Sequence, residues 1–210
     1  MAANALVPFG FRIANQYGSS SPNFQLNERQ IAYNNSNKIA FGDPVYGLNT
    51  GSIDLMAVGG TSIQGILTNV NYANSTSIGG VTFSNYWSAP SGLASSTIVT
   101  AKIYNDPTTV FMAQARGTAL TVSCVGQNID IYSGTSGAPN AAGISVCALD
   151  AGNVHTTNTL PFRIVGIVGL APGGGGVTGA GPIPNYNPLN DNQFLYVKFN
   201  TSELLSTTGF

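Results

Sequence analysis

The sequence predicts an all-β protein, a single β-barrel or a jelly-roll-like β-sandwich, with an extended N-terminal arm and a long Gly/Pro-rich loop. Three observations predict this class. Apolar and polar residues alternate with a period of two in several segments, 26 glycines and 11 prolines punctuate the chain, and no segment sustains a helical period. A chain of 210 residues can form one all-β unit, or at most two small ones, around a real core.

The alternation places strands, in chain order, at residues 39–41, 64–72, 98–104, 110–114, 162–168 and 192–199. These segments are rich in β-branched and aromatic residues, which fit a half-buried pleated surface. In the third, for example, Val99, Ala101 and Ile103 share the face opposite to Lys102. Each of Asp43 and Asp106 precedes a proline, and we expect both carboxylates to accept backbone N–H bonds in turns. A short helical turn is expected over residues 202–205.

Two stretches do not fit a strand pattern. Residues 1–22 are rich in Ala, Asn, Ser and Gly, with Phe9 and Phe11 as isolated aromatics, and we interpret them as an extended arm before an all-β domain over residues 23–210. Residues 171–191 are expected to form a long irregular loop, of the length that usually has a function or is disordered. Their glycines do not resemble a phosphate-binding loop, because no Gly-Lys-Ser/Thr follows them.

Charge is scarce along the whole chain. It carries 7 Lys+Arg and 8 Asp+Glu, or 7% charged residues, against about 25% in ordinary soluble proteins. A surface so neutral can pack against copies of itself without like-charge repulsion, so the composition favours a protein of a crowded, permanent assembly over an isolated polar β-domain. The scattered basic residues cannot form a groove for nucleic acid.

The sequence suggests no membrane segment, cofactor or metal site. No apolar run approaches the roughly 20 residues that span a bilayer, and the N-terminus lacks the features of a signal peptide, so synthesis in a cytoplasm is expected. Cys124 and Cys147 lack the spacing of a zinc site and are expected to be buried thiols; a disulfide between them would need adjoining strands.

Catalysis is not predicted. The single histidine, His155, has only Asp150 close by in sequence and is expected to be an exposed loop residue. No pair among the eight acidic residues has the spacing of a glycosidase site. Tyr86 and Trp87 could stack on a sugar, but the large apolar area of the only tryptophan favours a place in the core or in a subunit contact.

The order of several short motifs resembles that of a group of small structural proteins of tailed bacteriophages, the head decoration (cement) proteins. The resemblance spans nearly the whole chain, although each motif alone is short. This chain differs from those proteins at Arg12-Ile13, where in them a proline often follows the arginine, and in its longer loop at 171–191. The motifs lie at residues 8–12, 31–33, 41–46, 65–72, 86–87, 104–107, 110–114, 162–169 and 196–200.

The resemblance implies a non-enzymatic virion protein that binds the outside of the capsid shell, commonly as a homotrimer near three-fold positions. Its partners would be the major capsid protein and its own copies. The residues assigned to capsid binding are Pro8, Phe9, Gly10, Phe11 and Arg12, with the two aromatics lying across a neighbour.

Two other functions remain as alternatives. The first is a phage host-recognition or glycan-binding fibre module, with Trp87 and neighbouring tyrosines facing a glycan. The second is a cell-wall hydrolase, which the absence of a plausible acid/base pair disfavours.

Overall fold

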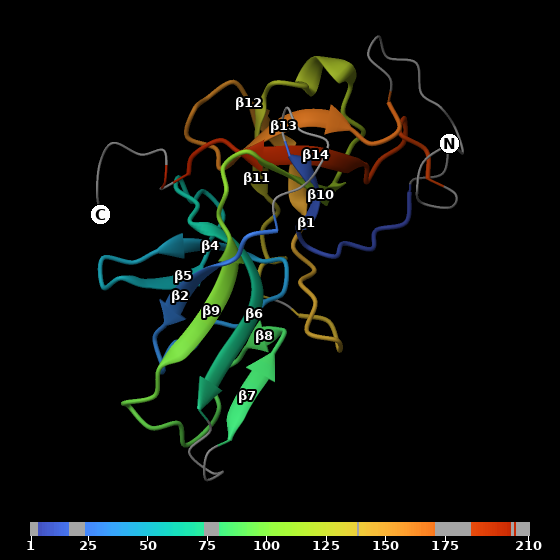
Figure 1. The fold of residues 1–210 in the computed structure, drawn as a ribbon. Coiled ribbons are helices and arrows are strands. Elements are labelled where there is room, and N and C mark those ends of the chain that lie inside the picture. Colours follow the sequence, from blue (N-terminus) through green and yellow to red (C-terminus); the bar gives the residue numbers. More distant parts are fainter. Residues whose placement is uncertain are drawn as a thin grey trace.

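The computed structural model describes residues 4–16, 24–73, 80–137, 139–170, 186–202 and 204. It confirms the all-β prediction: regular structure in the described residues consists of strands and one 3-10 helix, Val122–Cys124 (Figure 1). The strands are β1 (Arg12–Gln16), β2 (Asn27–Ile31), β3 (Ile39–Ala40), β4 (Pro44–Gly47), β5 (Ser52–Leu55), β6 (Gly65–Ala73), β7 (Val81–Ser84), β8 (Tyr86–Trp87), β9 (Val99–Tyr104), β10 (Thr109–Arg116), β11 (Asn128–Ile131), β12 (Leu149–His155), β13 (Phe162–Ile167) and β14 (Phe194–Phe199).

Twelve of these strands form two six-stranded sheets, and each sheet closes on itself. Sheet A has the order β1-β10-β12-β11-β13-β14, with a further pairing of β10 with β14 that closes it. Sheet B has the order β4-β5-β2-β9-β6-β7 and is closed by the pairing of β4 with β6. Strands β3 and β8 form a separate two-stranded ribbon. Closure removes most of the free strand edges that an open sheet would expose.

Sheet B is inserted in the chain between two paired strands of sheet A. β1 runs antiparallel to β10, with Arg12 opposite Met112 and Ile13 opposite Phe111, while β2 to β9 lie between them in sequence. The predicted division into an arm (1–22) and one domain (23–210) therefore needs correction. Residues 12–16 are a strand of a closed sheet, because their backbone completes the hydrogen bonding along β10.

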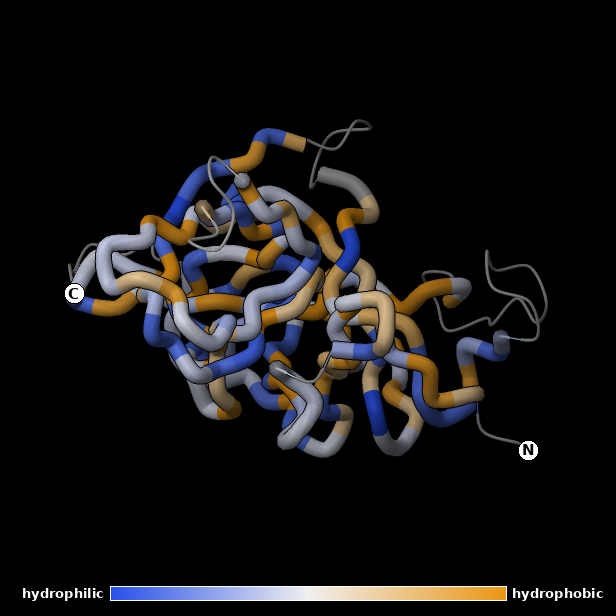
Figure 2. Tube along the Cα trace, turned by 90° about the horizontal axis from the view of Figure 1, so that it is seen from below, coloured by the Kyte–Doolittle hydropathy of each residue, from blue (hydrophilic) through white to orange (hydrophobic). Residues whose placement is uncertain are grey.

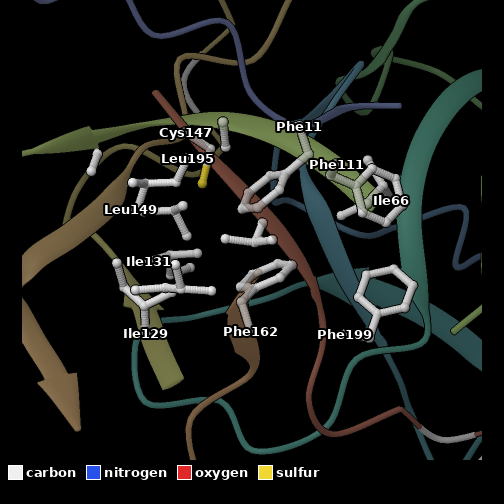
Figure 3. Packing of buried hydrophobic residues seen from close by; sticks show 14 of the residues in the cluster. Phe11, Ile66, Phe111, Ile129, Ile131, Cys147, Leu149, Phe162, Leu195 and Phe199 are labelled. Atoms are coloured by element: carbon white, nitrogen blue, oxygen red, sulfur yellow. The ribbon is translucent and has the colours of Figure 1, made fainter. Parts of the chain in front are cut away.

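Each closed sheet has its own apolar core, and the core of sheet A continues into sheet B. Residues of β10, β11, β13 and β14 pack with Phe11 inside sheet A (Figure 3), and Met56, Ile63 and Ile66 join this cluster from the sheet B region. A second cluster inside sheet B includes Ile53, Leu67 and Trp87. Apolar and polar positions interleave along the chain without long blocks of either kind (Figure 2). The shared cluster packs the two sheets against each other.

Both cysteines are free thiols, so the structure contains no disulfide between them. Cys147 is buried in the sheet A core, where burial raises the pKa of its thiol. Cys124 is only partly buried, which differs from the expectation that both would be buried.

Two predicted features fall partly or wholly beyond the described residues. Of the loop predicted at 171–191, residues 171–185 lie outside them, as do positions 203 and 205 of the helical turn expected at 202–205. The described end of the loop begins with Tyr186, whose hydroxyl accepts a hydrogen bond from the backbone N–H of Phe194 at 3.1 Å. Burial raises the pKa of Tyr186 to about 12, so this phenol stays neutral. No helix among the described residues is long and apolar enough to cross a membrane.

Candidate functional site

The candidate segment at the N-terminus is held against sheet A by side-chain amides. The Asn4 side chain donates to the carbonyl oxygens of Asn187 and Asp191 at 2.9 and 2.8 Å, and its own oxygen accepts from the Asn187 N–H at 2.9 Å. Gln114 of β10 accepts from the Val7 N–H at 2.8 Å and donates to the Ala5 carbonyl at 2.7 Å. These bonds fix residues 4–7 to their own chain, while the side chains of Leu6 and Val7 remain exposed.

The two aromatics of the segment have different environments. Phe9 is half-buried and stacks on Phe194, with ring centroids 5.5 Å apart. Phe11 is fully buried and stacks on Phe162 with ring centroids 4.3 Å apart, and its ring is nearly perpendicular to that of Phe111 at a centroid distance of 6.5 Å (Figure 3). The expectation that both rings lie across a neighbouring molecule is therefore corrected for Phe11, because its ring fills the core of sheet A.

Gly10 lies where three segments meet between the two sheets. Its φ of +70° is in the left-handed region, which favours glycine. A Cβ at this position would lie 2.7 Å from the carbonyl oxygen of Gly42 and 2.8 Å from the Cβ of Ser145. The next residue, Phe11, donates its N–H to the Gly42 carbonyl at 2.9 Å. Residues 10–12, 41–43 and 144–147 thus form one tightly packed contact, which we call the junction.

Arg12 is a half-buried cation at the edge of the junction. Its guanidinium carbon lies 3.9 Å from the ring centroid of Phe41 and 5.9 Å from that of Phe9, so its contacts are cation–π contacts. Burial lowers its pKa from the usual value. Among the described residues no acidic side chain pairs with Arg12, and its buried Nη1 has no hydrogen-bond partner there.

Asp43 is a buried acid at the centre of the junction. Its carboxylate accepts from the Ala40 N–H at 2.7 Å, from the Gly137 N–H at 3.3 Å and from the Ser145 hydroxyl at 2.5 Å. Burial raises its pKa from 3.8 to about 6, against these three bonds, which favour the charged form. The predicted role of Asp43 as a turn acceptor is confirmed, as is that of Asp106, which accepts from the Thr108 N–H at 2.8 Å.

The raised pKa predicts a pH dependence of stability that belongs to Asp43. Below about pH 4 the group is protonated in both states; between about pH 4 and pH 6 the folded state binds the proton more tightly, so its contribution to stability falls as pH rises. The free energy of unfolding of the wild type relative to Asp43→Asn should therefore decrease by about 2–3 kcal/mol across this window. Urea unfolding of both proteins at several pH values measures it, and a difference that is flat or increases with pH would contradict the assignment.

The described residues do not assemble a catalytic or metal centre. No group of three or more His, Cys, Asp or Glu side chains is placed to hold a metal ion in the part of the chain that the structure describes. His155 is exposed at the end of β12. An open groove of about 640 Å³ along β2 and β9 is lined by a mixture of hydroxyl, apolar and charged side chains, the charged ones being Glu28 and Arg29.

Trp87 lies in the core of sheet B, as its apolar area predicted. Its Nε1 donates to the Asn35 carbonyl at 3.0 Å, and Tyr72 packs edge-on against it at 5.7 Å. The glycan-binding alternative placed Trp87 on the surface, and this part of it is corrected because the side chain is fully buried. Tyr86 beside it is exposed.

Fold and site together define an all-β protein with two closed sheets. Its candidate segment consists of residues 4–11 and the start of strand β1, and it packs against sheet A. No family model matches the chain, and neither the curated proteins nor the solved structures give a match. The class of phage decoration protein accordingly stays a prediction from the order of the sequence motifs.

Proposed function

We propose that this chain is a structural virion protein that binds the outer surface of a phage capsid and stabilises contacts between capsomers. It acts as a homotrimer, is made in the host cytoplasm, and has the major capsid protein as its partner. The resemblance of the motif order supports this proposal, as do the low charge of the chain and its all-β fold.

The observation that carries the proposal is a surface that combines little charge with many exposed apolar side chains. Only 7% of the residues are charged. The exposed large apolar side chains lie in the N-terminal segment, on strand β7 of sheet B and in connecting segments; they include Leu6, Val7, Val81, Phe83 and Ile98. Apolar groups on a surface that lacks repelling charges favour burial against other proteins.

The mechanism follows from burial and repetition. A rigid body that spans a junction between capsomers adds contact area on both sides, and each apolar side chain buried there contributes about 1.5–3 kcal/mol. Three linked copies of a modest site gain an avidity of about 10²–10⁴ over one contact when geometry allows simultaneous binding. A pressurised shell is thereby stabilised where capsomers adjoin.

The structure changes which residues of the N-terminal segment can make the capsid contact. Phe11 and Gly10 are buried in their own chain, whereas Leu6 and Val7 are exposed and half-buried Arg12 has no acidic partner among the described residues. Deleting residues 1–12 would remove Phe11 from the core, so a deletion of the segment cannot separate binding from folding. Substitutions at Leu6 and Val7 do separate them.

We expect the double variant Leu6→Ser/Val7→Ser to fold and to bind capsids at least about tenfold more weakly than the wild type, because it loses apolar burial at each copy. The measurement is the number of copies bound per head when purified protein is added to heads that lack it. Val122→Ser/Val125→Ser, an exposed apolar pair elsewhere, is the matched control and should bind normally. Undiminished binding of the Leu6/Val7 variant would overturn the role of this segment; failure of the wild type to bind heads would overturn the proposed function.

A further inference from the structure

Strand β7 carries apolar side chains on its solvent-facing side. Val81 and Phe83 are 54% and 76% exposed, and they alternate with Thr82 and Ser84, which are half-buried. In the neighbouring strand β6, Val70 is buried and Tyr72 packs on Trp87, so the intervening residues Asn71 and Ala73 face outward with Phe83 and Val81. A phenylalanine that is three-quarters exposed on a regular strand is not part of this chain's own core.

Ile98 extends this apolar surface across a third strand. β6 pairs with β9 in a register that sets Tyr72 opposite Val99, so the next pair brings Ile98 beside Ala73, which is itself opposite Val81. Ile98 is 64% exposed. Val81, Phe83 and Ile98 thus lie on one face, and we call them the β7 patch. β7 lies at the end of sheet B away from sheet A (Figure 1).

Strands β6 and β7 carry no charged residue, and the charged residues in the groove that Ile98 lines, Glu28 and Arg29, belong to β2. Between Asp54 and Lys102 the sequence contains no Lys, Arg, Asp, Glu or His. The ion pair between Lys102 and Glu28, at 3.8 Å, lies farther along the same strands, toward the other end of β9. β7 also pairs only with β6 among the described strands, which leaves its other edge open. Natural edge strands are usually protected by lysine, proline or an inward charge, and Val81–Ser84 has none of these.

We propose that the β7 patch surrounds the three-fold axis of the homotrimer and forms the contact between its copies, an inference that rests on the proposed function. A second copy fits this surface because side chains around a three-fold axis meet their own equivalents from the other copies, so any charge there would repel, and neither β6 nor β7 carries one. A different partner would place no such demand on the patch. The N-terminal segment, with Leu6 and Val7, is then left for the capsid.

The test compares two exposed phenylalanines. Phe83→Ser should dissociate the oligomer and raise the concentration of half-dissociation by about tenfold or more, since each copy loses a buried ring. Phe83→Asp should dissociate it further, because every copy then brings a negative charge to the same contact. Phe24→Ser is the control and should leave the oligomer intact. Phe24 is 62% exposed and precedes β2, which at that end pairs with Ile103 of β9. Native mass spectrometry and light scattering across a dilution series report the number of copies, and circular dichroism confirms folding.

The outcomes separate this inference from the proposed function. The inference is supported if the wild type and Phe24→Ser are trimers while the Phe83 variants are folded monomers. Phe83 variants that remain trimeric overturn the patch as the contact but leave the trimer and capsid binding standing. A wild type that is monomeric at all concentrations overturns the inference together with the trimer, whereas capsid binding is decided independently by the copies bound per head. If the Phe83 variants fail to fold, Val81→Ser/Ile98→Ser replaces them with the same two outcomes.

Discussion

Replacing Phe11 with alanine is expected to lower the free energy of unfolding by about 3–5 kcal/mol, the usual cost of deleting a buried aromatic ring. The ring is fully buried, stacks on Phe162 at 4.3 Å and contacts Phe111 through its edge. These partners belong to β13 and β10, so the lost ring leaves a cavity between strands of a closed sheet. Such a sheet cannot collapse freely into the space, which places the expected cost in the upper part of the range for core substitutions.

Urea unfolding followed by fluorescence and circular dichroism measures this loss. Phe24→Ala changes the same residue type at an exposed position and should shift stability by no more than about 0.5 kcal/mol. Phe11→Leu, which keeps much of the apolar volume, should lose less than Phe11→Ala and remains informative if the alanine variant does not fold. A Phe11→Ala protein as stable as the wild type would contradict the burial of this ring in the core of sheet A.

The strands that the sequence located are those with strong alternation. β9 and β14 have apolar residues at every second position facing a core. In β6, Ile66 faces the sheet A cluster, and a register shift lets Leu67 and Val70 both face the sheet B cluster. Each of the three was predicted within a few residues of its observed bounds. β2 was missed because four of its five residues, Asn27 to Gln30, are polar or charged and only Ile31 is buried. β12 was missed because it contains glycine and asparagine and has only Leu149 fully buried. Such strands form because neighbouring strands supply their hydrogen-bond partners, which local sequence does not report.

Closure of the two sheets depends on pairings between distant segments. β10 pairs with β14, and β4 pairs with β6, although β5 lies between β4 and β6 in the sequence. These pairings distinguish two closed sheets from one barrel or one sandwich, and a periodicity analysis does not contain them. The same limit explains Phe11. An isolated aromatic in a polar segment has the local pattern of an arm, and only the tertiary contacts with Phe111 and Phe162 make it a core residue.

Of the candidate site, the local hydrogen bonds could be predicted from the sequence, and the bonds between distant residues could not. Asp43 before Pro44 was expected to accept a local N–H, and its bond to Ala40, three residues away, is of that kind. Its bonds to Gly137 and Ser145 join residues 94 and 102 positions apart, and no local signal announced them. Trp87 was predicted to lie in the core or in a subunit contact from its size alone, because a large apolar side chain has more to gain from burial than from exposure; the structure places it in the core.

We expect Asp43→Ala to lower the free energy of unfolding by about 3 kcal/mol or more at neutral pH. The substitution leaves the N–H groups of Ala40 and Gly137 and the Ser145 hydroxyl without their acceptor in a buried place, and each unsatisfied buried polar group costs about 1–3 kcal/mol. The carboxylate also joins Ala40 of β3 to Gly137 and Ser145, which precede β12 of sheet A in the chain. Its loss should therefore loosen the junction as well as lower stability.

Amide hydrogen exchange distinguishes these two effects. In Asp43→Ala the N–H groups of residues 40, 137 and 147 should lose protection first, the last because Cys147 donates to the Ser145 hydroxyl oxygen at 2.9 Å. Asp43→Asn keeps the shape and one acceptor oxygen and should lose less. Asp150→Ala, which removes a carboxylate that accepts from the exposed Gly152 N–H at 2.9 Å, should be nearly neutral. If Asp43→Ala were as stable as Asp150→Ala and kept its amide protection, the two sheets would be held together by their shared apolar cluster alone, and the buried carboxylate would have no part in joining them.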